Sequence, residues 1–231
     1  MKDGTPCDND SQLNAAQSIA ILRASMVPIV NVMNEFDQRV QQSEECEKVR
    51  DGLLQSLDDE VDKCVHLGVE TVLKYHREWQ QLQSTSSENS FVIGTFSRSS
   101  TMKSILNQVL QTIQSEHQVK VICSQSSPGD EGELMAKDTN AKCLSDQSFQ
   151  QRIQAGKMNL VLVGADCILQ NGSGVVNKVG TAALATCCKQ ASVSILSVAD
   201  KWKLWEDEYP PGLEDIFELV PSDLLDQVLV P

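Results

Sequence analysis

The stretch that decides the fold is Leu160-Val161-Leu162-Val163-Gly164-Ala165-Asp166, in which an apolar run ends at a glycine and a carboxylate. A short branched apolar run closed by turn residues is typical of a strand buried on both faces. Asn171-Gly172-Ser173-Gly174 supplies a further turn, a helix is predicted from about Ala182 to Gln190, and Val193 to Val198 reads as the next strand. Strands that alternate with a helix in this way indicate a parallel sheet.

The same alternation extends in both directions along the chain. Phe91-Val92-Ile93 predicts a strand, and Met102 to Ile113 carries apolar residues at helical spacing. Val119 to Cys123 predicts another strand, and Leu219-Val220 indicates a last edge element. We therefore expect an α/β domain with a mostly parallel sheet that helices cover on both faces. The polar stretch from Thr139 to Lys157 gives no clear prediction of a strand.

The N-terminal third of the chain reads as helical. An apolar helix is expected around Pro28, which would bend or restart it. A second helix is predicted from Glu44 to Leu57 and a third from Asp58 toward Trp79, and their apolar stripes predict a small bundle. The polar, serine-rich segment Gln83 to Ser90 reads as a hinge, so we place a helical N-terminal domain at residues 1–88 and the sheet domain at residues 89–231.

Charge and cysteine usage exclude several classes of function. The 231 residues include 19 Lys and Arg against 32 Asp and Glu, a formal net charge of −13 that repels phosphate backbones. We therefore expect no direct binding of nucleic acid or of an anionic membrane, and no apolar stretch approaches the roughly 20 residues of a membrane helix. The first twelve residues lack the apolar core of a secretory signal, so a cytoplasmic protein with reduced cysteines is expected. The eight cysteines form no CxxC pair, so neither a metal site nor a cofactor is expected.

The candidate site lies in three polar turns, because ligands of parallel sheets gather beyond the carboxyl ends of the strands. These turns are Thr95 to Ser100, Ser124 to Gly132 and Gly164 to Thr181. Asp166 comes directly off a buried strand, and Lys178 precedes a helix start whose free amides favour an anion, with Thr181 as its predicted cap. Such a pair could hold the hydroxyls and the phosphate of a sugar phosphate. The other interpretation is plain turn structure, with Asp166 capping a turn and Lys178 and Arg98 solvated.

The motifs of this region resemble those of one protein family. Leu160 to Asp166, Asn171-Gly172 and Asn177-Lys178-Val179-Gly180-Thr181 together resemble the signature of the alpha, beta and delta subunits of eukaryotic translation initiation factor two-B. The same family includes methylthioribose-1-phosphate isomerase and ribose-1,5-bisphosphate isomerase. The resemblance runs from about Phe91 to the C-terminus. It implies a helical N-terminal domain joined to a Rossmann-like domain of the NagB/RpiA/CoA transferase-like type, which mediates dimerisation.

The resemblance also implies roles for individual residues. In the isomerases the Asp of the motif is the catalytic acid and the Asn-Lys pair contacts the sugar phosphate, and these roles fall on Asp166, Asn177 and Lys178. The catalytic cysteine of the family falls on Thr95, which is not a thiolate equivalent. The Glu-x-Arg-Pro turn of the family falls on Gln125-Ser126-Ser127-Pro128, which lacks the acid and the arginine. The strand that follows in the family reads as eroded in Lys142 to Lys157.

These departures favour a noncatalytic protein over an enzyme. We expect a subunit of the initiation factor two-B type that forms an oligomer with other such subunits. It would assemble or regulate guanine-nucleotide exchange on initiation factor two, with Asp166, Asn177, Lys178 and Arg98 as ligand-binding residues. The alternative is a sugar-phosphate isomerase, or a protein that senses a sugar phosphate, built on the same cavity.

Overall fold

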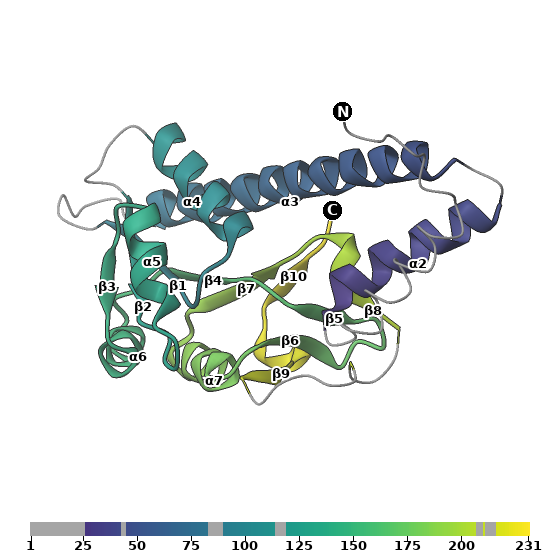
Figure 1. Ribbon diagram of the computed structural model, residues 1–231. Helices are drawn as coiled ribbons and strands as arrows, with labels where there is room; N and C mark the ends of the chain where they lie inside the picture. Colours follow the sequence, from purple (N-terminus) through teal and green to yellow (C-terminus); the bar gives the residue numbers. More distant parts are fainter. Residues whose placement is uncertain (1–25, 43–44, 83–89, 114–118, 207–209, 211–215) are drawn as a thin grey trace.

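A computed structural model describes residues 26–42, 45–82, 90–113, 119–206, 210 and 216–231, and its centre is a six-stranded sheet (Figure 1). The strand order is β10-β7-β4-β1-β2-β3, and every neighbouring pair is parallel. The predicted α/β fold with a mostly parallel sheet is therefore confirmed. Its strands are β1 (Phe91–Thr95), β2 (Val119–Ser124), β3 (Lys142–Leu144), β4 (Leu160–Val163), β7 (Ser194–Val198) and β10 (Gln227–Leu229).

Helices cover both faces of this sheet, and each face has its own core. On one face, α6 (Asp146–Gln154) and α7 (Thr181–Ala191) bury Phe149, Ile153 and Leu184 against the sheet. On the other face, α4 (Ser100–Thr112) and α5 (Glu131–Asp138) bury residues that include Met102 and Met135. The central strands are buried along their whole length, which explains their unbroken apolar runs.

A smaller four-stranded sheet follows β4, in the order β8-β5-β6-β9. The region that the sequence suggested was a long turn contains an antiparallel hairpin, in which β5 (Cys167–Leu169) and β6 (Gly174–Lys178) flank the turn at residues 170–173. The predicted last edge element is β9 (Phe217–Pro221), which pairs with β6 rather than with the main sheet. The fourth strand is β8 (Leu204–Trp205).

The N-terminal helices agree with the prediction only in part. Pro28 lies in the first turn of α2 (Val27–Gln41), where its missing N–H costs nothing, so of the two alternatives predicted for it, a helix that restarts there fits and a bend does not. The boundary predicted between Leu57 and Asp58 is wrong, because α3 (Cys46–Leu82) is one helix of 37 residues. The first half of α3 packs on α2, and its second half lies against α4 and adds Val65 and Val72 to the core beneath the sheet. Residues 83–89 of the predicted hinge lie outside the described residues, and the division at residue 88 stays a prediction.

The polar stretch from Thr139 to Lys157 holds both a strand and a helix. The short strand β3 lies at the edge of the sheet and pairs through only three residues, so a strand is present here in a reduced form. Ser145 caps α6 by accepting a hydrogen bond from the backbone amide of Ser148, and the helix buries two apolar side chains at a spacing of four residues, Phe149 and Ile153. Within the described ranges, no helix is long and apolar enough to cross a membrane.

Candidate functional site

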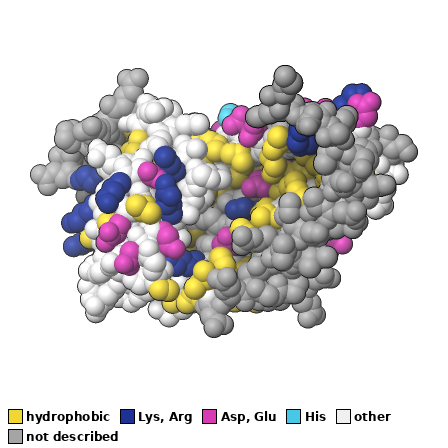
Figure 2. Space-filling view, viewed as in Figure 1, with side chains coloured by type: hydrophobic (Ala, Val, Ile, Leu, Met, Phe, Trp, Pro, Cys, Tyr) yellow, Lys and Arg dark blue, Asp and Glu magenta, His cyan; other side chains and the backbone are white. Residues whose placement is uncertain are grey.

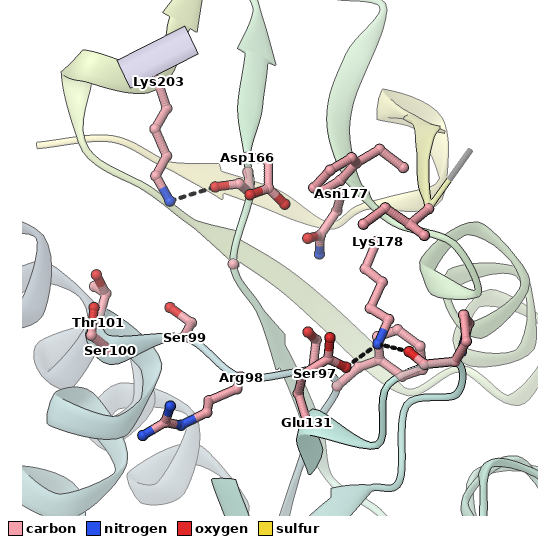
Figure 3. Close-up of a pocket in the computed structure, with 16 residues that line it drawn as sticks. Ser97, Arg98, Ser99, Ser100, Thr101, Glu131, Asp166, Asn177, Lys178 and Lys203 are labelled. Carbon is pink, nitrogen blue, oxygen red and sulfur yellow. Dashed lines mark hydrogen bonds and ion pairs between the residues drawn. The ribbon is translucent and has the colours of Figure 1, made fainter. Parts of the chain in front are cut away.

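A cavity of about 380 Å³ opens at the carboxyl ends of β1 and β4, where the three predicted turns meet (Figure 3). Four of the predicted ligand-binding residues line it together, namely Arg98, Asp166, Asn177 and Lys178. Thr95, at the position of the family cysteine, is not among the lining residues. It ends β1, is 1% exposed, and its hydroxyl has no hydrogen-bond partner among the residues that the structure describes. The structure therefore separates Thr95 from the other four side chains.

Lys178 is buried, and its ammonium group is hydrogen-bonded to other groups of the protein. The side chain is 7% exposed, and Nζ donates to the carbonyl oxygens of Ser126 (2.6 Å) and Pro128 and to the carboxylate of Glu131. An ammonium group has three protons to donate, so these three bonds occupy all of them. Figure 3 shows the bond to Glu131. The interpretation of Lys178 as a solvated surface charge is wrong. No proton of Lys178 is free for a ligand in this arrangement.

The backbone amides at the N-terminus of α7 are also hydrogen-bonded within the protein. Glu218 on β9 accepts hydrogen bonds from the amides of Gly180 and Ala182 at 2.8 Å each, through the same carboxylate oxygen. The predicted cap is wrong, because Thr181 lies inside the helix and its hydroxyl donates to the carbonyl of Lys178 at 2.7 Å. Amides and the helix dipole do attract an anion here, but that anion is a carboxylate of the chain.

Asp166 directly follows the turn after β4 and is exposed to the cavity. Although solvent reaches it, surrounding protein partly removes its carboxyl from bulk water and raises its pKa above the ordinary value, while the positive charge of Lys203 opposes this shift. Lys203, which the sequence analysis did not single out, lines the cavity and donates to the carbonyl oxygen of Ala165 at 2.5 Å.

Asn177 is a buried polar side chain of the site that lacks a hydrogen bond within the described part of the protein. It lies on β6, is 6% exposed, and its amide points into the cavity between Asp166 and Lys178 (Figure 3). Its Nδ2 has no hydrogen-bond partner among the described residues. A buried amide donor without a partner is costly, so a ligand oxygen at this position would be stabilising.

Arg98 lines the cavity, but its guanidinium is directed toward another helix. Its Nε and Nη2 donate to one carboxylate oxygen of Asp138 on α5, at 3.1 Å and 2.9 Å. These hydrogen bonds are the main cause of a lowered pKa for Asp138, and the charge of Lys103 adds to the effect. Arg98 is half exposed, so this ion pair is open to solvent.

Asp146, in the stretch that gave no prediction, holds the second turn of the site in place. Its carboxylate accepts hydrogen bonds from the Ser124 hydroxyl (2.5 Å) and from the amides of Ser126 (2.6 Å) and Ser127 (2.9 Å). Burial acts to raise the pKa of Asp146, but these hydrogen bonds outweigh it and leave the pKa below its usual value. The turn then presents the carbonyl oxygens that receive Lys178.

The charges of the cavity largely cancel. Lys178 pairs with Glu131, Lys203 lies near Asp166, and Arg98 pairs with Asp138 outside the lining, so each cation of the cavity has an acidic partner or neighbour. The groups without a strong internal partner are the Asp166 carboxylate and the Asn177 amide, which suit the hydroxyls of a small polar ligand. No group of three potential metal ligands occurs in the part of the chain that the structure describes.

The fold and this site define an α/β protein with a polar cavity at the carboxyl edge of a parallel sheet. The chain belongs to the Initiation factor 2 subunit family, whose model matches residues 10–228. The resemblance seen in the sequence motifs is thereby confirmed at the level of the family.

Solved structures and a curated relative agree with this assignment. The translation initiation factor eIF-2B of Pyrococcus horikoshii has a TM-score of 0.74 at 18% identity, over 96% of this chain and 82% of that one. The 5-methylthioribose 1-phosphate isomerase of the same organism has a TM-score of 0.66 at 15% identity, over 98% and 73%. The beta2-delta2 tetramer of eIF2B from Chaetomium thermophilum gives a TM-score of 0.67 at 19% identity, over 96% and 76%.

The curated relative is an enzyme that the chain matches only in part. The ribose 1,5-bisphosphate isomerase of Methanocaldococcus jannaschii is 29% identical over 111 residues, which is 46% of this chain and 35% of the isomerase. The chain therefore has relatives in both the initiation-factor and the isomerase branches of its family.

Proposed function

We propose that the chain is a noncatalytic subunit of the initiation factor two-B type. It would assemble with other subunits of that type and regulate guanine-nucleotide exchange on translation initiation factor two in the cytoplasm. The observation that carries this proposal is the internal neutralisation of the cavity, in which Glu131 occupies Lys178 and Glu218 occupies the N-terminus of α7.

The chemistry of an aldose–ketose isomerisation supports this proposal. Such a reaction needs paired groups that transfer a proton or a hydride in a site closed to water, and a group that holds the phosphate. Asp166 supplies one candidate acid, but Thr95 has no acidic thiol and its side chain does not line the cavity. The arginine of the family's Glu-x-Arg-Pro turn is replaced by Ser127. A single carboxyl group without its partners is a poor catalyst.

The test of this proposal is assembly. The chain would be co-expressed with the initiation factor two-B-type subunits of its own source, and the purified product would be weighed by native mass spectrometry. A stable complex of defined stoichiometry that contains those subunits is the expected result. A chain that stays monomeric at micromolar concentration and recovers none of the subunits would overturn the proposal.

A second candidate function is a sugar-phosphate isomerase or sensor. The observation that favours it is the pairing of Asp166, whose pKa is raised, with the unpartnered amide of Asn177 in one cavity. Ribose 1,5-bisphosphate and 5-methylthioribose 1-phosphate would be added to the wild-type chain and to Asp166→Asn, with product formation and heat of binding as readouts. Turnover or binding by the wild type that Asp166→Asn abolishes would favour this function over the first.

A further inference from the structure

We propose that Glu131 determines which ligands the cavity accepts, because its carboxylate occupies the position on Lys178 that the anionic group of a ligand would take. This inference rests on the proposed function and deepens it, since it gives a physical reason why a subunit with the family's cavity would not use a sugar phosphate. It predicts that phosphorylated small molecules are excluded by one side chain rather than by the shape of the cavity.

The three hydrogen-bond acceptors of Lys178 differ in whether a ligand could replace them. Two are carbonyl oxygens of the turn that Asp146 fixes, so they are part of the backbone frame. The third is the carboxylate of Glu131, which lines the cavity and is 39% exposed, against 7% for Lys178. Among the described residues, Glu131 is thus the only carboxylate that forms an ion pair with Lys178, and it is the more exposed partner of that pair.

The backbone that carries Glu131 is fixed. Glu131 is the first residue of α5, and the next residue, Gly132, approaches the carbonyl of Ser124 so closely that an added Cβ would lie 1.6 Å from that oxygen. Gly132 also donates its amide to the carbonyl of Gln125 at 3.1 Å. The helix start therefore packs directly on the turn and is hydrogen-bonded to it, and the carboxylate is held beside Lys178 as a tethered anion.

A tethered carboxylate has two effects on an incoming phosphate. It accepts the hydrogen bond from Lys178 that the phosphate would otherwise accept. Its negative charge also repels a second anion placed a few ångströms away. Removal of this single charge, with the amide oxygen left in place, should make the same cavity attractive to an anion. Glu131→Gln is therefore the informative substitution.

The experiment is calorimetric titration of inorganic phosphate and of ribose 5-phosphate into the full chain. We expect Glu131→Gln to bind both at least about tenfold more tightly than the wild type, the change expected for one charge-assisted hydrogen bond. Glu133→Gln, an exposed glutamate of the same helix, is the matched control and should behave as the wild type. Wild-type binding as tight as that of Glu131→Gln, or a folded Glu131→Gln that binds neither anion, would overturn the inference.

A second variant establishes where the anion binds. Glu131→Gln/Lys178→Met removes the buried cation together with its partner, so it should lose the phosphate binding that Glu131→Gln gains. Equal binding by both variants would place the anion elsewhere and overturn the inference. If Glu131→Gln is unfolded in buffer without anions, phosphate should refold it, and a chain that phosphate leaves unfolded would also count against the inference.

These outcomes are independent of the assembly test. If Glu131 does not control anion binding, the titrations fail while the mass of the subunit complex is unchanged. If the chain is not an initiation factor two-B-type subunit, the complex is missing while the titrations can still succeed.

Discussion

Asp146 offers the sharpest test of how the site is supported, because one carboxylate orders a whole turn. Its three donors are the Ser124 hydroxyl and the amides of Ser126 and Ser127. Ser124 is 1% exposed and Ser126 is 0% exposed, whereas Ser127 is exposed. Asp146→Ala therefore leaves two buried donors without a partner, while water can replace the third bond.

The magnitude follows from these two buried donors. A buried donor left unpaired costs about 1–3 kcal/mol, so Asp146→Ala should lower the free energy of unfolding by about 2–6 kcal/mol. Both buried donors share one oxygen of Asp146, which Asp146→Asn can keep, so this variant should cost less than Asp146→Ala. For a chain of this length each kcal/mol corresponds to about 2–4 °C in Tm. Urea denaturation followed by circular dichroism measures the loss, with Asp58→Ala on the exposed face of α3 as the control.

The pH dependence adds an independent check. The folded-state pKa of Asp146 lies below its ordinary value, so its stabilising contribution is present above the unfolded-state pKa of about 4 and is lost as the pH falls through the folded-state pKa. The difference in stability between the wild type and Asp146→Asn should therefore be full at pH 7 and should shrink below about pH 4. A midpoint of Asp146→Ala at pH 7 that matches the Asp58→Ala control would refute the account of the turn.

Three further substitutions test other parts of the structure. Glu218→Ala removes the cap of α7 and should cost about 1–2 kcal/mol in urea unfolding; a loss below about 0.5 kcal/mol would contradict the capping role. Gly68→Ala places a Cβ 2.4 Å from Ile105 Cδ1 and should destabilise the fold, whereas Gly52→Ala in the same helix has room and should stabilise it by up to about 1 kcal/mol. Thermal unfolding should therefore show a lower Tm for the first variant and a higher Tm for the second, and shifts of the same sign would contradict this account. Burial lowers the pKa of His76, so the fold loses stability as the pH falls below about 6.5. His76→Phe should reduce the slope of unfolding free energy against pH by up to about 1.4 kcal/mol per pH unit. An unchanged slope between pH 7 and 5 would show that His76 is not the cause.

The central strands and their helices could be predicted from sequence because each carries its own signal. Residues 160–163 were predicted as a strand and form β4 with the same limits, and the other central strands agree within one or two residues. A strand buried on both faces needs a continuous apolar run, which no other element of this length requires. One helix on each face of the sheet, α4 and α7, was also predicted, whereas α5 and α6 were not.

The long helix α3 could not be predicted as one element, because its apolar stripe changes partner along its length. Its first half faces α2 and includes Val49 and Leu53, and its second half faces α4 and the sheet and includes Val65 and Val72. The buried face continues through Leu53, Glu60 and Cys64, but the acidic run around Asp58 and Asp59 looks like a helix boundary in the sequence. The short edge strand β3 was missed for a different reason, since an edge strand of three half-exposed residues needs little apolar character.

The chemistry of the site was the part that sequence alone could not decide, because the meaning of each charge depends on a partner far along the chain. Lys178 and the start of α7 both read as anion sites, and physically both are. Their anions are supplied by Glu131, 47 residues before Lys178, and by Glu218, 38 residues after Gly180. A motif matched one residue at a time registers the cation and the free amides but not the carboxylate that neutralises each of them. The same Asn177-Lys178 pair can therefore belong to a site that holds a phosphate or to one that has replaced the phosphate with its own side chains, and the charge on Glu131 is the variable that separates the two.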